Sequence, residues 1–285
     1  MPERLLRNRG RLRNAIAFHH VRILKRAFEA FMQDDWNPSV SREISEYRIS
    51  LTSWRPRLPH LPLVLLTLLQ QTLRPKEIVV WLTVEDHAAL AENIRERFGE
   101  FGVCFQICDD LQSHKKWLPM IEEGHRDPFV ICDDDIIYPK EWFAALVTEN
   151  RSDAYVGAKC HRIVLDSNRA VGPYSAWKKQ IRTDGQPSHY VFITGCGGGV
   201  IHPDRISNKF LDRTEMFKQC PRNDDIWLKA AHLAAGIPCY KTRYCFPCLE
   251  FPGTNESGLA TVNVDSGGND KQIRNLNQYF SIISR

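Results

Sequence analysis

Four short apolar segments alternate with helical patterns between residues 48 and 150, and this alternation constrains the fold more than any other feature. The segments are 48–54 (RISLTSW), 77–83 (EIVVWLT), 103–108 (VCFQIC) and 128–132 (PFVIC). The helical patterns that follow them cover residues 57–73, 87–100, 115–125 and 139–150. Strands that alternate with helices of this length predict parallel βαβ units with right-handed crossovers. We therefore predict an α/β fold with a mostly parallel central sheet flanked by helices.

The second half of the chain is less regular. Residues 154–165 and 189–203 have the apolar composition of strands, and the polar segment between them predicts an irregular connection. Residues 222–238 have the acidic first turn and the glycine stop of a helix. The chain therefore divides into a leader, a regular half and a more irregular half: residues 1–47, 48–150 and 151–285.

The leader is strongly basic. Residues 1–26 contain eight Lys or Arg against one acid, Glu3, which gives a net charge of +7. Because the whole chain has 38 bases and 34 acids, the other residues carry 30 bases and 33 acids, a net charge of −3. Leucines and a phenylalanine are interspersed with the bases, as in segments that bind anionic membrane surfaces. We expect residues 1–26 to contact such a surface and not nucleic acid; the alternative is a solvated basic helix packed on the body.

The sequence also predicts a compartment. No apolar stretch approaches the roughly 20 residues that span a bilayer, since LPLVLLTLL (61–69) is about half that length. The N-terminus lacks the apolar core and cleavage site of a signal peptide. Nine cysteines then predict reduced thiols, and CFPC (245–248) has zinc-knuckle spacing without a second pair. We expect a cytoplasmic protein, peripheral on the cytoplasmic face of the membrane if the leader binds there.

Three adjacent aspartates follow the fourth predicted strand, in the stretch FVICDDDIIYP. Neighbouring carboxylates repel one another unless a positive charge lies between them. One interpretation is a solvated turn that dilutes the repulsion, and the other is a bound divalent cation. In an open α/β sheet, ligands collect at the carboxyl ends of the strands, where Asp133 and Asp135 would point the same way. This position favours a Mg²⁺ or Mn²⁺ site, because these ions prefer oxygen ligands.

Five motifs follow one another in the order LTSWRPR, CDDLQSHKK, CDDD, TGCGGGV and NDDIW. This order resembles the metal-dependent glycosyltransferases of the GT-A fold, and most closely the family-2-like bacterial enzymes that build surface polysaccharides. The resemblance runs from about Arg48 to the C-terminus and leaves the leader outside. It implies a GT-A (Rossmann-like) domain over residues 48–285, with the nucleotide bound by the regular half and the acceptor by the irregular half.

The resemblance implies a donor site built by the first three motifs. Asp135, with Asp133, would hold Mn²⁺ or Mg²⁺ against the diphosphate of a nucleotide sugar, and one of the three carboxylates would bind the ribose. The residues implied in nucleotide binding are Thr52, Ser53, Arg57, Asp110 (or Asp109), Lys115, Lys116, Asp133 and Asp134. The alternatives for these side chains are structural, namely an N-cap for the aspartate, a charged loop for the arginine and solvated lysines in a first helical turn.

NDDIW supplies the predicted catalytic base. An inverting transfer needs a carboxylate that takes the proton of the acceptor hydroxyl, and two adjacent acids at a helix N-terminus can have separated pKa values. We assign this role to Asp225, with Asp224 as the second choice; the alternative is that both aspartates cap the helix. The motif is also similar to that of exostosin-like transferases, which are retaining, so the stereochemistry stays open.

Two glycine-rich segments complete the site that the resemblance implies. Gly197, Gly198 and Gly199 would line the donor-sugar and acceptor pocket, since glycine permits close backbone approach; a bulged strand is the alternative. Asn269 and Asp270, in VNVDSGGNDKQ, would belong to a loop that closes over the donor phosphate and metal, or to a plain surface turn.

The sequence thus predicts a metal-dependent glycosyltransferase that moves a sugar from a nucleotide-sugar donor, with UDP-sugars expected, to a glycan or lipid-linked acceptor in surface polysaccharide synthesis. Two other interpretations stay open. A sugar-phosphate nucleotidyltransferase also combines an α/β sheet, a divalent metal and a nucleotide, but LTSWRPR lacks the glycine-rich signature expected near its first strand. A catalytically silent, membrane-apposed binding module is the third, and such a module has no need of so many neighbouring carboxylates.

Overall fold

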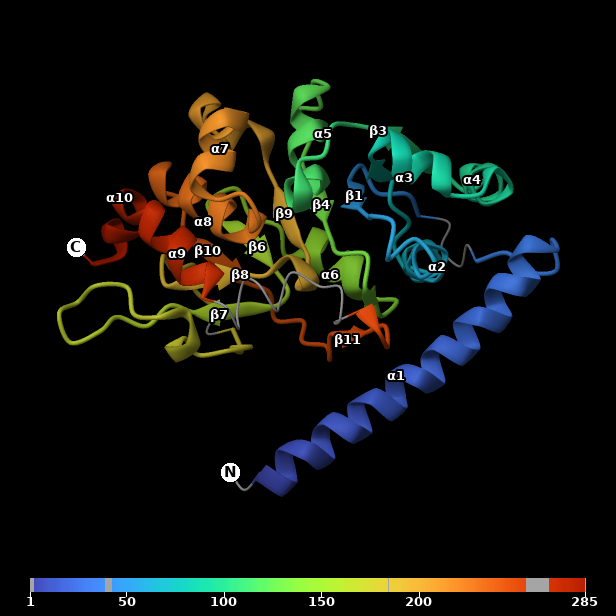
Figure 1. Ribbon diagram of the computed structural model, residues 1–285, viewed down its shortest axis with the longest axis horizontal. Helices are drawn as coiled ribbons and strands as arrows, with labels where there is room; N and C mark the ends of the chain where they lie inside the picture. Colours follow the sequence, from blue (N-terminus) through green and yellow to red (C-terminus); the bar gives the residue numbers. More distant parts are fainter. Residues whose placement is uncertain (1–2, 39–42, 184, 255–266, 285) are drawn as a thin grey trace.

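The computed structural model describes residues 3–38, 43–183, 185–254 and 267–284. Its centre is a seven-stranded sheet in the order β10-β6-β9-β4-β1-β2-β3 (Figure 1). These strands are β1 (Arg48–Thr52), β2 (Ile78–Leu82), β3 (Val103–Ile107), β4 (Phe129–Ile131), β6 (Tyr155–Gly157), β9 (Gly199–Ile201) and β10 (Cys239–Lys241). β1 pairs in parallel with β2 and β4, β2 with β3, and β6 with β10, whereas β9 is antiparallel to β4 and β6. The four strands expected between residues 48 and 150 are therefore confirmed, in a mostly parallel sheet.

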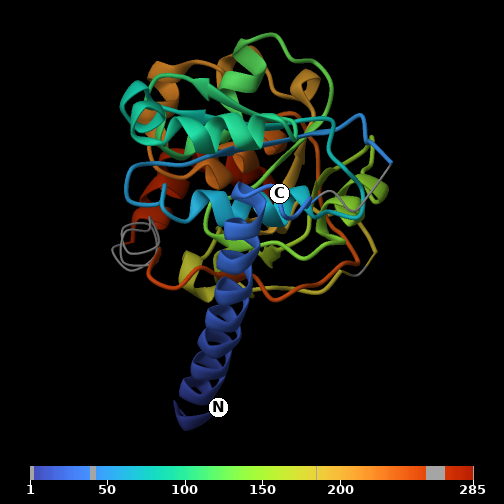
Figure 2. The same cartoon turned by 90° about the vertical axis from the view of Figure 1, so that its right-hand side faces the viewer.

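Helices cover both faces of the sheet (Figures 1 and 2). They are α2 (Leu61–Leu69), α3 (Val84–Ala89), α4 (Glu92–Gly99), α5 (Leu118–Glu122), α6 (Trp142–Thr148), α7 (Arg213–Gln219), α8 (Asp224–Ala234), α9 (Gly268–Asn275) and α10 (Asn277–Phe280). In β2, Ile78, Val80 and Leu82 belong to one buried cluster with α2 and α6, whereas Val79 and Trp81 belong to a second cluster with α5 and α8. Because successive side chains point to opposite faces, a strand covered on both sides is apolar throughout.

The irregular half differs from the prediction in where its strands break. Residues 154–165 form β6 and a separate β7 (Cys160–Arg162), and residues 189–203 form β8 (Val191–Ile193) and β9. β6 and β9 pair inside the main sheet, while β7 and β8 pair in a second, two-stranded sheet. Each predicted strand is thus shared between two sheets, and periodicity does not reveal such a break, because the apolar character continues across it. A further two-stranded sheet joins β5 (Ile136–Ile137) to β11 (Leu249–Glu250).

The leader forms one long helix, α1 (Glu3–Met32). Its C-terminal part packs on the body, where the Phe31 ring lies 4.8 Å from that of Phe98 and the Arg97 guanidinium lies 4.7 Å from Phe31. The rest of α1 extends past the body toward the N-terminus, as both ribbon views show (Figures 1 and 2). Among the helices of the described ranges, none combines the length and the apolar character needed to cross a membrane.

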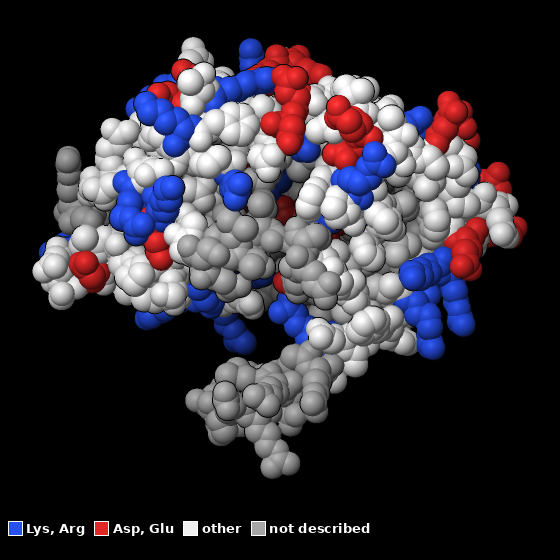
Figure 3. Space-filling view, in the orientation of Figure 1, with Lys and Arg blue, Asp and Glu red and all other residues white. Residues whose placement is uncertain are grey.

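Charges on the body are mixed. On the face seen in Figure 3, Lys and Arg side chains are interspersed with Asp and Glu side chains and form no continuous basic stripe.

Candidate active site

The aspartates after β4 lie at the carboxyl edge of the sheet, close to basic side chains. Asp134 accepts a 2.5 Å hydrogen bond from Ser53 Oγ, and its other oxygen lies 2.7 Å from the Arg57 guanidinium. A second nitrogen of Arg57 lies 3.0 Å from Asp135. Because β1 and β4 are parallel neighbours, the residues that follow β1 meet those that follow β4. Repulsion within the triplet is therefore offset by a protein cation, which neither interpretation of the sequence anticipated.

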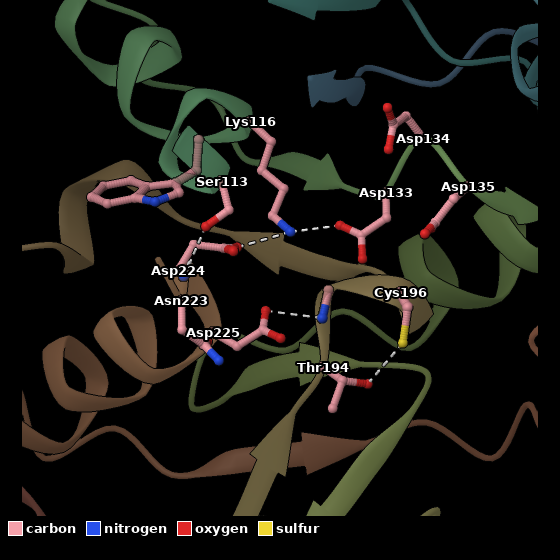
Figure 4. A network of polar contacts seen from close by, with 12 residues as sticks. Ser113, Lys116, Asp133, Asp134, Asp135, Thr194, Cys196, Asn223, Asp224 and Asp225 are labelled. Carbon is pink, nitrogen blue, oxygen red and sulfur yellow. Dashed lines mark hydrogen bonds and ion pairs between the residues drawn. The ribbon is translucent and has the colours of Figure 1, made fainter. Parts of the chain in front are cut away.

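Lys116 joins the remaining aspartate of the triplet to the start of α8 (Figure 4). Its Nζ lies 2.6 Å from Asp133 Oδ1 and 2.9 Å from Asp224 Oδ2. Burial alone would lower the pKa of Lys116, but the charges of Asp133 and Asp224 outweigh burial and raise that pKa well above its usual value. Ser50 Oγ fixes the backbone by donating to the Lys116 carbonyl at 2.8 Å. Lys116 therefore stays charged and holds together two carboxylates that are distant in the sequence.

The turn between β8 and β9 brings its backbone against this cluster. In the antiparallel pairing of β4 and β9, Gly199 lies opposite Ile131, so the residues that precede β9 lie beside those that follow β4. The Gly195 amide donates to Asp225 Oδ1 at 2.9 Å (Figure 4). A Cβ at Gly195 would lie 2.5 Å from Lys116 Nζ and 3.0 Å from Asp225 Oδ1. Only glycine fits this approach without displacing a charged group.

Asp225 is the carboxyl group best suited to proton transfer. Burial, and next the charge of Asp224, raise the pKa of Asp225 well above its usual range, although Lys116 and the Gly195 amide oppose this. Asp225 as a residue is of intermediate burial, so part of its surface remains exposed. A carboxylate whose pKa is raised is a stronger base than an ordinary aspartate, which suits it to proton transfer.

The N-terminus of α8 is capped by a different residue. Asn223 Oδ1 accepts from the Ile226 amide at 3.0 Å, and Asn223 Nδ2 donates to Asn269 Oδ1 at 2.8 Å. The Asp224 amide donates to Ser113 Oγ at 3.3 Å. The alternative that Asp224 and Asp225 merely cap the helix is therefore wrong, because Asn223 has that role.

The triplet differs in accessibility from one aspartate to the next. The exposed fraction of the side chain is 28% for Asp133, 5% for Asp134 and 13% for Asp135. Burial raises the pKa of Asp135 well above its usual range, against the charge of Arg57. A ligand that approaches the triplet therefore meets Asp133 first.

A thiol lies at the edge of the same site. Cys196 Sγ accepts from Lys159 Nζ at 3.2 Å and lies 3.5 Å from Thr194 Oγ1 (Figure 4). The hydrogen bond from the Cys248 thiol, together with the charge of Lys159, outweighs burial and lowers the pKa of Cys196 to about 6. No sequence signal distinguishes this residue, because a single cysteine among glycines has no partner spacing. Of the two cysteines of CFPC, Cys248 packs here and its thiol donates to the Cys196 carbonyl at 3.5 Å, whereas Cys245 is exposed.

Three predicted nucleotide-binding residues make local contacts instead of contacts with the triplet. Thr52 Oγ1 donates to the Trp81 carbonyl at 2.8 Å and thereby links β1 to β2. Asp110 accepts from the Gln112 amide at 3.0 Å, and Lys115 Nζ lies 3.5 Å from the same carboxylate. The two contacts of Asp110 stabilise the 3₁₀ turn Gln112–Lys116 that carries Lys116 into the site.

The predicted pocket glycines lie at tight packing positions. Gly198 adopts a φ of 82°, a conformation that favours glycine, and Trp142 Nε1 donates to the Gly197 carbonyl at 2.7 Å. Gly199 belongs to β9, where a Cβ would lie 2.5 Å from Tyr155 Oη. Their contribution to a pocket stays a prediction, and Gly195, which approaches the charged cluster, is the glycine that the sequence did not single out.

The predicted loop at Asn269 and Asp270 is wrong. Both residues lie in the first turn of α9, after Gly267 with a φ of 71°. Asn269 is 3% exposed and contacts the cap of α8, while Asp270 Oδ1 accepts from the Tyr174 amide at 2.7 Å. Both residues thus belong to a helix and not to a loop, and their contribution to a donor pocket stays a prediction. The segment that precedes them, 255–266, lies outside the described residues.

The donor set fits a divalent cation only in part. In the portion of the chain that the structure describes, no group of three or more His, Cys, Asp or Glu side chains is arranged to hold a metal ion. Asp133 and Asp135 supply two carboxylates, each with one oxygen in an ion pair. Mg²⁺ and Mn²⁺ accept one or two carboxylates when substrate phosphates complete the coordination. The residues therefore fit a cation that is bound jointly with a phosphate group.

Comparison with known proteins bears on the fold. No protein-family model matches the chain, and no curated protein matches its sequence. A mannosyltransferase from Pyrobaculum calidifontis in complex with GDP-Man and Mn²⁺ aligns with a TM-score of 0.51 and 12% identity, over 96% of this chain and 79% of its own. A 2-C-methyl-D-erythritol 4-phosphate cytidylyltransferase from Thermus thermophilus aligns with a TM-score of 0.42 and 13% identity, over 77% and 100%. The second likeness is too remote to carry an argument, and the first concerns the fold alone. The chain has a GT-A-like α/β fold, as the resemblance of its motifs implied.

Proposed function

We propose that the protein is a glycosyltransferase that moves a sugar from a nucleotide-sugar donor to a hydroxyl group of a glycan or lipid-linked acceptor, in surface polysaccharide synthesis. The observation that carries the proposal is the environment of Asp225. This carboxyl group is partly exposed, has a raised pKa, and is held by the Gly195 amide beside the cluster of Asp133, Lys116 and Asp224. The GT-A-like fold supports a nucleotide at this edge of the sheet.

Asp225 acts as the general base. It takes the proton of the acceptor hydroxyl while that oxygen attacks the anomeric carbon, and a single displacement of this kind inverts the configuration of the sugar. The hydrogen bond from Gly195 engages Oδ1, and Oδ2 would take the proton of the acceptor. Asp224 lies 2.9 Å from Lys116, and burial, followed by the charge of Asp224, raises the pKa of Asp225. Proton transfer of this type contributes about 10²–10⁴-fold to the rate.

The triplet forms the donor side of the site. Asp133 and Asp135 would hold Mn²⁺ or Mg²⁺, which supplies positive charge to the departing nucleoside diphosphate. Ser53 and Arg57 hold Asp134 and keep the loop after β4 in place. UDP-sugars are the expected donors, and the fold neighbour that binds GDP-Man is a precedent for a nucleotide sugar as the class of ligand.

Nucleotidyl transfer is the alternative reaction, and the products distinguish the two. The purified protein is incubated with Mn²⁺ or Mg²⁺ and a panel of nucleotide sugars, and separately with nucleoside triphosphates and sugar phosphates. Release of nucleoside diphosphate from a nucleotide sugar supports glycosyl transfer, whereas release of pyrophosphate supports nucleotidyl transfer. No turnover together with no nucleotide binding identifies a binding module. Full activity in EDTA contradicts the use of a metal ion.

The base is tested by Asp225→Asn with Asp127→Asn as the control. Asp127 is an aspartate whose side chain is 72% exposed and whose carboxylate lies 4.0 Å from the Arg48 guanidinium. We expect Asp225→Asn to bind donor and to lose roughly 10²–10⁴-fold in kcat, and Asp127→Asn to keep normal turnover. Normal turnover in Asp225→Asn together with lost turnover in Asp224→Asn would assign the general base to Asp224.

A further inference from the structure

One stripe of α1 is buried against the body. Ala17, Leu24 and Phe31, spaced seven residues apart, are 3%, 8% and 0% exposed. Arg13, one turn before Ala17, also contacts the body at β11. Its guanidinium contacts the carbonyl of Cys248, directly before β11, and lies 3.4 Å from Glu250 in β11. α1 is therefore fixed to the body along this stripe.

A second apolar stripe of α1 faces solvent. Leu12, Ile16 and Ile23 are 63%, 40% and 52% exposed. At 3.6 residues per turn, these three positions lie along one line of the helix, roughly 100° around the axis from the buried stripe. Isolated exposed apolar residues are ordinary, but three in line on one helix form an apolar surface that water solvates poorly.

Basic side chains accompany this stripe. Arg22, Lys25 and Arg26 are exposed on the same helix, in a segment whose first 26 residues carry eight bases and one acid. The other residues of the chain carry a net charge of −3. Positive charge is thus concentrated on α1 and not spread over the molecule.

We propose that the exposed stripe of α1 binds the surface of an anionic phospholipid bilayer. Leu12, Ile16 and Ile23 enter the boundary between headgroups and acyl chains, and the neighbouring bases contact lipid phosphates. Charge favours this occupant over a second copy of the chain, because two such helices would bring seven net positive charges each into one interface. Both ribbon views show that the N-terminal part of α1 extends past the body (Figures 1 and 2).

The docking helix is linked to the triplet of aspartates. Arg13 contacts β11, and the Phe251 amide, directly after β11, donates to the Asp135 carbonyl at 2.9 Å. If the proposed transfer to a lipid-linked acceptor holds, docking of α1 brings the aspartates close to the leaflet that carries the acceptor. This last step rests on the proposed function; membrane binding itself does not.

Sedimentation with vesicles tests the inference on the full chain. We expect binding to vesicles of mixed phosphatidylglycerol and phosphatidylcholine at about 0.1 M salt, and release at about 1 M salt, where charges are screened beyond about 3 Å. Vesicles of phosphatidylcholine alone should bind at least tenfold more weakly. Equal binding to both kinds of vesicle, or no binding to either, overturns the proposal, and neither outcome depends on catalytic activity.

Point variants separate the two components of the surface. Ile16→Ser with Ile23→Ser should weaken binding more than tenfold, whereas Ile107→Ser, at a residue of β3 that is 49% exposed, should leave it unchanged. Arg22→Gln with Arg26→Gln should weaken binding roughly 10- to 30-fold, against no change for Lys218→Gln on α7. Point variants are preferable to deletion of α1, because Phe31 belongs to the core. Unchanged binding in both double variants, or a dimer on size-exclusion chromatography that Ile16→Ser with Ile23→Ser dissolves, overturns the bilayer as the occupant.

Discussion

Lys116 and Asp224 form a 2.9 Å ion pair between the turn that follows β3 and the first residue of α8. The two side chains are 5% and 6% exposed, so the pair lies out of water. The same ammonium also pairs with Asp133 at the end of β4. One lysine therefore connects the proposed donor side of the site with the helix that carries the proposed base.

Removal of this lysine should destabilise the protein. Lys116→Met leaves Asp133 and Asp224 without their shared cation, and breaking a buried pair in this way typically lowers the free energy of unfolding by about 3–5 kcal/mol. Urea unfolding followed by circular dichroism measures the change. Lys218→Met, at a side chain that is 71% exposed, is the control and should change stability by less than about 0.5 kcal/mol. A similar small change in Lys116→Met would show that the two carboxylates do not need the ammonium.

Asp225→Asn should stabilise the protein, and increasingly so as the pH rises. The folded-state pKa of Asp225 lies above the unfolded-state value of about 3.9, so the protonated form favours the folded protein. The stability that Asp225 contributes is present below about pH 4 and is lost as the pH rises through the folded-state pKa. Asparagine removes this loss and still accepts from Gly195.

Thermal unfolding at several pH values tests this expectation. The difference in Tm between Asp225→Asn and the natural sequence should be small at pH 4 and positive at pH 7, with Asp127→Asn giving no such trend. A difference that is constant with pH would contradict a raised pKa for Asp225.

The regular half of the fold was predictable because its signals are local. EIVVWL and FVIC are continuous apolar runs of strand length, and each lies between amphipathic or capped helical segments. The breaks within residues 154–165 and 189–203 were not predictable. β6 and β7 belong to different sheets although the apolar pattern runs through both, and only the pairing with β9 and β8 separates them.

The candidate site was predictable as a set of positions but not as a set of contacts. The strand-end rule placed Asp133 near a ligand edge, and the acidic start of α8 singled out Asp225. The sequence did not reveal that Lys116 is buried between carboxylates. This burial depends on the residues after β3, the end of β4 and the start of α8 meeting in three dimensions. The prediction of a loop at Asn269 was wrong for a related reason. The glycines before this residue are typical of a turn, but here they lie at the start of α9.

Gly195→Ala should impair the site more than the fold. The added Cβ would lie 2.5 Å from Lys116 Nζ and 3.0 Å from Asp225 Oδ1, so one of these charged groups must move. We expect at least a tenfold loss of kcat and a loss of stability of about 1–3 kcal/mol, the usual effect of overpacking. Gly99→Ala, where a Cβ meets no atom within 4 Å, is the control for both measurements. Unchanged kcat with intact stability would show that the turn relaxes without disturbing the cluster.

Cys196 should be the most reactive thiol of the site at neutral pH. Its pKa is lowered to about 6 by the Cys248 thiol and the charge of Lys159, whereas burial raises the pKa of Cys108, also partly exposed, to about 12. Because the thiolate is the reacting form, iodoacetamide at pH 7.5 should label Cys196 well before Cys108, as peptide mass spectrometry can measure. The labelling rate of Cys196 should fall about tenfold per pH unit below pH 6. Lys159→Met removes the cation 3.2 Å from the sulfur and should move the midpoint of the rate to higher pH. A midpoint near the ordinary thiol value of about 8.5 in the natural sequence would contradict the thiolate at this edge of the site.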